Sequence, residues 1–91
     1  MEKELLDLKE KILNSISILM SNYQNCIDAN MKDPNSSLYN KIESLIEQVN
    51  AIEDKMALSE VIIEAKTIEM ELDRWITSQG QSTLNILWPD I

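Results

Sequence analysis

Residue types that perform acid–base, nucleophilic or metal chemistry are scarce in this chain of 91 residues. It contains no histidine, which excludes imidazole catalysis and histidine-containing zinc sites. The single cysteine, Cys26, cannot form an internal disulfide or a thiolate metal site, and we interpret it as a small buried hydrophobic residue. The single glycine, Gly80, excludes a glycine-rich phosphate loop. We therefore predict that the chain is not an enzyme and has no catalytic residues, metal site or cofactor.

Acidic residues do occur in pairs at helical spacing. Glu60 and Glu64 are four residues apart, as are Glu69 and Asp73, so each pair lies on one face of a helix. Di-iron sites in helical bundles combine such acids with Glu-x-x-His, and this chain has no histidine. We therefore interpret both pairs as solvent-exposed acidic surface.

The overall charge limits the partners. Sixteen acidic residues against eight basic ones give a net charge of −8. Such a chain repels phosphates, so we expect neither nucleic acid nor an anionic membrane surface as a partner. The acidity is read either as a solvated face or as a complement to a basic partner. No small-molecule substrate is expected.

Two features bear on the localisation. No apolar run approaches the roughly 18 residues that a membrane span requires. The first residues, Met1-Glu2-Lys3-Glu4, do not resemble a signal peptide. The predicted localisation is cytoplasmic, with export by a route that needs no cleavable signal as the alternative.

The elements that carry these residues are predicted to be helices. Apolar residues recur at steps of three and four, which is the pattern of amphipathic helices. A first helix is predicted over 2–30 and a second over 34–78, with Asp33 as the N-cap and Pro34 as the first helical residue. The first helix carries Leu5, Leu8, Ile12, Ile16, Leu19, Tyr23 and Cys26. The second carries Leu38, Ile42, Leu45, Val49, Ile52 and Met56, followed by Leu58, Val61, Ala65, Ile68, Leu72 and Trp75.

The two apolar series of the second helix are out of phase, because Met56 and Leu58 are only two residues apart. Residues 57–59 contain neither glycine nor proline, which favours one continuous helix with two apolar faces. The alternative is a break at 57–59 that produces a three-helix bundle. The predicted fold is all-α, an antiparallel helical hairpin with a long second helix and coiled-coil-like packing. The predicted organisation is a single helical domain over 1–80, closed by a left-handed cap at Gly80, and an apolar C-terminal tail over 81–91.

The middle of the first helix lacks charge. No charged residue occurs from Ile12 to Ile27, where the polar residues are serine, asparagine and glutamine. Such side chains allow another surface to approach at a low cost of desolvation. The helix is interpreted either as merely polar on this side or as covered on both sides.

The lengths of the two helices predict an association surface. At ~1.5 Å per residue the second helix is about 65–70 Å long and the first is about 44 Å, so the first covers the second only to roughly residue 62. An apolar overhang would remain beyond that residue, and the tail is also apolar. The tail is read either as folding back onto the chain's own helices or as docking on a partner through Trp88. The predicted partner-binding residues are Ile63, Ile68, Met70, Leu72, Trp75, Leu84, Leu87 and Trp88.

One short motif has a counterpart in a known group of proteins. Asp33-Pro34 followed by Leu38-Tyr39-Asn40-Lys41-Ile42 resembles the turn region of type III secretion needle subunits, which are helical hairpins with a long C-terminal helix. The small, acidic and helical export chaperones of these systems are similar in size and charge. The resemblance covers about ten residues, and the tail over 79–91 departs from a needle subunit, which ends with its helix. It implies a helical protein that assembles with copies of itself or with a client.

Three functions follow from these patterns. The first is a non-enzymatic protein–protein interaction module that serves as a structural subunit of a helical assembly. The second is a small acidic chaperone of a type III-like secretion system that masks a client helix. The third is an acidic inhibitor or immunity protein directed against a basic partner. All three expect a protein partner or a homo-oligomer.

Overall fold

The computed structural model describes residues 2–28, 37–78, 80 and 84–89, and it forms three helices. Helix α1 spans Glu2–Asp28, α2 spans Ser37–Ala51 and α3 spans Lys55–Ser78. No strand occurs among the described residues, so the all-α prediction is confirmed. The predicted turn, with Asn30 as helix end and Asp33-Pro34 as helix start, lies outside the described residues.

The single long helix over 34–78 was a wrong prediction, because the chain leaves helical geometry at residues 52–54. The Ile52 N–H is shared between the carbonyls of Gln48 and Val49, which closes the last turn of α2. The Asp54 carboxylate then accepts a hydrogen bond of 3.2 Å from the Met56 N–H. This is the N-cap arrangement, in which an aspartate satisfies an unpaired donor of the first turn. The predicted alternative break at 57–59 falls inside α3 instead.

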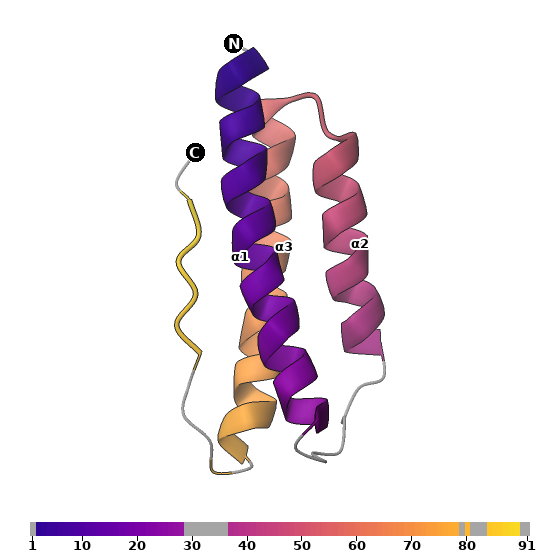
Figure 1. The fold of residues 1–91 in the computed structure, drawn as a ribbon, viewed down its shortest axis with the longest axis vertical. Coiled ribbons are helices and arrows are strands. Elements are labelled where there is room, and N and C mark those ends of the chain that lie inside the picture. The colour runs from indigo at the N-terminus through magenta and orange to yellow at the C-terminus, as the bar shows by residue number, and fades with distance from the viewer. Residues whose placement is uncertain (1, 29–36, 79, 81–83, 90–91) are drawn as a thin grey trace.

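The three helices pack against one another in a bundle (Figure 1). Helix α2 runs antiparallel to α1, and α3 turns back so that it runs in the same direction as α1. The longest extent of the chain is 44 Å. That length is about what the 27 residues of α1 require at ~1.5 Å each. The predicted overhang of a longer second helix is therefore absent.

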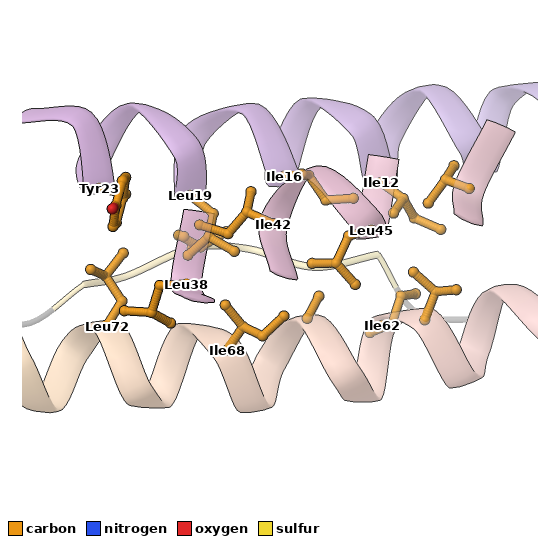
Figure 2. Close-up of a cluster of buried hydrophobic side chains, with 14 of the residues drawn as sticks. Ile12, Ile16, Leu19, Tyr23, Leu38, Ile42, Leu45, Ile62, Ile68 and Leu72 are labelled. Atoms are coloured by element: carbon orange, nitrogen blue, oxygen red, sulfur yellow. The ribbon is translucent and has the colours of Figure 1, made fainter. Parts of the chain in front are cut away.

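The core lies along the common axis of the three helices, and each helix contributes the apolar side that its spacing predicted (Figure 2). Four residues of α2 are fully buried, Leu38, Ile42, Leu45 and Val49. The core residues of α1 are Ile12, Ile16, Leu19, Tyr23 and Cys26, and those of α3 are Leu58, Val61, Ile62, Ala65, Ile68, Leu72, Trp75 and Ile76.

Gly80 caps the end of α3. It has a φ of 81°, and its N–H donates to the Thr77 carbonyl just beyond the end of α3, which confirms the predicted left-handed cap.

None of the helices α1–α3 has the length and apolarity that crossing a membrane requires.

Candidate functional site

The C-terminal tail, which we define as residues 84–89, lies in extended form along the bundle against α1 and α3 (Figure 1). It runs in the direction opposite to both helices. Exposure alternates along it: Leu84, Ile86 and Trp88 face the helices and pack against the core, whereas Leu87 is 83% exposed. The tail therefore packs on the helices of its own chain through alternate side chains, as a bound extended peptide would.

Two carboxylates of α3 hold the tail by its N–H groups. Asp73 Oδ1 accepts a hydrogen bond of 2.8 Å from the Leu84 backbone N–H. Glu69 accepts two, one of 3.3 Å from the Ile86 N–H and one of 2.8 Å from the indole N–H of Trp88. An isolated extended segment has no partner for its N–H groups, and leaving them unpaired in a partly buried position is costly. The carboxylates of α3 thus accept hydrogen bonds from N–H groups that a neighbouring strand would accept in a sheet.

Helix α1 supplies the matching donor. The Ser15 hydroxyl donates a hydrogen bond of 2.7 Å to the Leu87 carbonyl. Ser15 is only 5% exposed and is the only polar residue buried among those described. A serine is tolerated in this position because the tail carbonyl accepts the hydrogen bond of its hydroxyl.

The interpretation of Glu69 and Asp73 as solvent-exposed surface was wrong, because both are half-buried at the edge of the tail. The distance between residues four apart on a helix is close to the distance between alternate residues of an extended segment. Glu69 and Asp73 therefore reach alternate residues of the tail. The available signal was the combination of such acids with an apolar tail that contains a tryptophan. The uncharged stretch of α1 was a second signal, and Ser15 belongs to it.

The structure distributes the predicted partner-binding residues over three environments. Ile68, Leu72 and Trp75 are buried in the chain's own core, because the break at 52–54 folds α3 back onto α1 and α2. Leu84 and Trp88 are half-buried by the tail's docking on the same chain. Leu87, which was expected to be buried, points away from the helices.

Ile63 and Met70, the two remaining predicted residues, lie on the outer face of α3. With Met56 they form a row spaced by seven residues, which we call the outer row. Met56 is 77% exposed, Ile63 65% and Met70 61%. Residues seven apart lie nearly above one another on a helix, so the three exposed side chains of the outer row lie along one line of α3.

The opposite side of α1 forms a shallow groove with α2. Its volume is about 510 Å³. The residues that line it are Leu13, Ser17, Met20, Ser21 and Gln24 of α1 and Tyr39, Glu43 and Ile46 of α2. The uncharged stretch of α1 therefore has two sides, one covered by the tail at Ser15 and one open toward α2.

Two of the described titratable groups have shifted pKa values. Burial raises the pKa of the Cys26 thiol, which disfavours the reactive thiolate. A hydrogen bond to Glu43, together with its negative charge, raises the pKa of the exposed Tyr39. Within the described part of the chain, no group of three or more acidic or cysteine side chains is placed to hold a metal ion.

One aromatic cluster lies near the end of α3. The Tyr23 ring lies 6.0 Å from Trp75 and 6.1 Å from Tyr39, measured between centroids, in tilted contacts that are typical of packed aromatic side chains. Tyr23 and Trp75 of this cluster belong to the core, whereas Tyr39 is exposed.

No family model, no curated protein and no solved structure matches the chain.

Proposed function

We propose that this protein is a non-enzymatic interaction module, a structural subunit that associates with a second copy of itself through the outer row of α3. The observation that carries the proposal is the exposure of Met56, Ile63 and Met70 on a helix whose other apolar side is fully used in the core. Apolar residues at a spacing of seven supply one of the two apolar positions of the heptad by which helices pair in coiled-coil-like packing. The exposure of this row now supports the proposal in place of the overhang expected from the sequence.

The charges beside the outer row favour an antiparallel copy as the partner. A second row beside the outer row, also spaced by seven residues, consists of Glu60, Thr67 and Arg74. Glu60 and Arg74 are exposed. In an antiparallel pair centred on Thr67, Glu60 of each copy lies opposite Arg74 of the other. Ile63 then lies within one residue of the level of Met70 in the other copy. The twofold arrangement would therefore bring opposite charges and apolar side chains together twice.

Sedimentation equilibrium at micromolar concentration tests the proposal. Ile63→Glu is expected to weaken association by at least about tenfold, because it removes buried apolar area twice and introduces two unpaired charges. Asn40→Glu is the matched control, since it adds the same charge at an exposed position of α2 and should leave association unchanged. Wild-type chain that remains a monomer at all concentrations would refute the proposal.

The charge pattern can be tested separately. Glu60→Arg alone should weaken the pair a few-fold, and adding Arg74→Glu should restore it, with both effects shrinking at high salt. If the double reversal fails to restore association, the partner helix does not run antiparallel in this register.

One observation favours a second candidate, the chaperone function. The groove between α1 and α2 has apolar residues at its base and uncharged polar side chains along α1, which would accept a client helix at a low desolvation cost. Substituting Met20→Glu in this groove would impair client binding and leave the outer row intact. The inhibitor function is supported only by the net charge of −8.

A further inference from the structure

The surface of α1 and α3 that holds the tail, which we call the seat, contains Ser15, Glu69 and Asp73. Unlike the outer row, the seat has a known occupant. We propose that the seat also binds residues 84–89 of a second copy, so that two chains exchange their tails. The proposal does not depend on the outer row, because it uses a different side of α3.

The contacts that hold the tail do not depend on how it is connected. Every hydrogen bond described for the tail joins it to a side chain of α1 or α3, namely Ser15, Glu69 or Asp73. The apolar contacts of Ile86 and Trp88 are likewise made with the bundle core. A tail from another molecule could form the same set of contacts with no new complementarity. A second copy is the one partner that always carries this segment.

The connection between α3 and the tail is short in sequence. Only residues 79–83 lie between the end of α3 and the tail, and residues 84–89 run in the direction opposite to α3. Gly80 adopts a φ of 81°, which ordinary side chains disfavour and glycine accepts freely. A Cβ at Gly80 would meet no atom within 4 Å, so a substitution there acts through the backbone and not through a clash.

The connection decides whether a tail binds its own chain, which we call the closed form, or a second copy. Because the connection is short, the chain's own tail has an effective concentration of about the millimolar range and competes with the tails of other copies. The closed form therefore dominates at micromolar concentration, and exchange increases as the protein approaches the millimolar range. A residue that disfavours the left-handed conformation of Gly80 penalises the closed form and favours exchange.

Cross-linking between two differently labelled full-length chains tests the proposal. One chain carries Asn14→Cys and the other Leu87→Cys, both with Cys26→Ala, because Asn14 and Leu87 are exposed and border the same shallow depression. A short bis-maleimide should link the two chains only where the tail of one lies on the helices of the other. Both chains also carry Ile63→Glu, which suppresses association through the outer row. A chain with both cysteines serves as the positive control for the closed form.

The expected result is a cross-linked dimer that increases from about 10 µM to about 1 mM protein. It should be about tenfold more abundant with Gly80→Ala than with Gly80→Asn, since asparagine tolerates the left-handed conformation. The background is measured by pairing Asn40→Cys, on the exposed side of α2, with Leu87→Cys. Cross-linking no greater than this background for Gly80→Ala at about 1 mM would overturn the proposal and leave the tail as a fixed part of its own chain. Because these chains lack the outer-row contact, failure here is distinguishable from failure of the proposed dimer.

Discussion

The core between the three helices and the seat of the tail differ in the kind of atoms that meet there. In the core, branched aliphatic side chains such as Leu45 and Ile16 are fully buried. At the tail, the contacts combine half-buried Leu84 and Trp88 with four hydrogen bonds between side chains and the opposing segment. Apolar packing is non-directional, whereas hydrogen bonds fix the position and direction of a segment. The core therefore determines the bundle, and the polar seat determines the register of the tail.

The largest effect is expected in the core. Leu45→Ala removes a fully buried side chain from α2 and leaves a cavity, so it should lower the free energy of unfolding by about 2–5 kcal/mol. Leu87→Ala, at an exposed position of the tail, should change it by less than about 0.5 kcal/mol. Urea denaturation followed by circular dichroism measures both. Equal losses for the two variants would mean that the core and the tail are not distinct layers.

A smaller effect is expected when the tail loses its tryptophan. Trp88→Ala removes both the indole hydrogen bond to Glu69 and the half-buried ring, and should cost about 1–3 kcal/mol. Amide hydrogen exchange at Leu84 and Ile86 should become fast while α1–α3 remain protected. Trp88→Phe keeps a ring and loses the donor, so its cost should be intermediate. Loss of protection throughout α3 as well would show that the bundle needs the tail in order to fold.

Ser15→Ala isolates a single hydrogen bond of the seat. Removing the donor to the Leu87 carbonyl should cost about 0.5–1.5 kcal/mol. Ser17→Ala is the matched control, since it makes the same chemical change at an exposed position on the same helix and gains the same helix propensity. The difference between the two variants, measured by denaturation, gives the contribution of the seat. No difference would mean that the hydroxyl is not bound by the tail in solution.

The smallest effect is expected for the exposed ion pair between α2 and α3. Lys41 Nζ lies 3.3 Å from a carboxylate oxygen of Glu71, and both side chains are more than a third exposed. A double-mutant cycle with Lys41→Met and Glu71→Gln should give a coupling of about 0.2–1 kcal/mol that decreases with added salt. A larger coupling that does not change with salt would mean that this pair is shielded from solvent, like the polar contacts of the tail.

The apolar pattern predicted most of the core, because spacing at three and four directly reports which side of a helix is buried. Ile12, Ile16, Leu38, Ile42 and Leu72 lie where the pattern placed them. It did not predict the position of the break. The phase change between Met56 and Leu58 was evident, but the chain turns earlier, at 52–54, where Asp54 caps the next helix. An aspartate inside an apparently continuous apolar pattern is a weak signal, and Met56 consequently lies on the outside of α3.

The seat of the tail could be predicted only in part. The apolar composition of the tail indicated docking, but Trp88 was predicted as an anchor only for docking on a partner. The partners were not identified, because Glu69 and Asp73 are ordinary acids in sequence and become ligands only when the tail runs antiparallel beside them. No helical periodicity encodes that direction, which Figure 1 shows for residues 84–89.

The hydrogen bond from Ser15 to Leu87 joins residues that are 72 positions apart. This contact closes a loop of nearly the whole chain, whereas the tail's hydrogen bonds to α3 join residues only 11, 17 and 19 positions apart. We therefore expect the tail to meet α3 early and the Ser15 hydrogen bond to form last, once α1 has packed against α3. Until α1 arrives, the surface that receives the tail lacks the Ser15 side, and the first tail to complete it need not be its own.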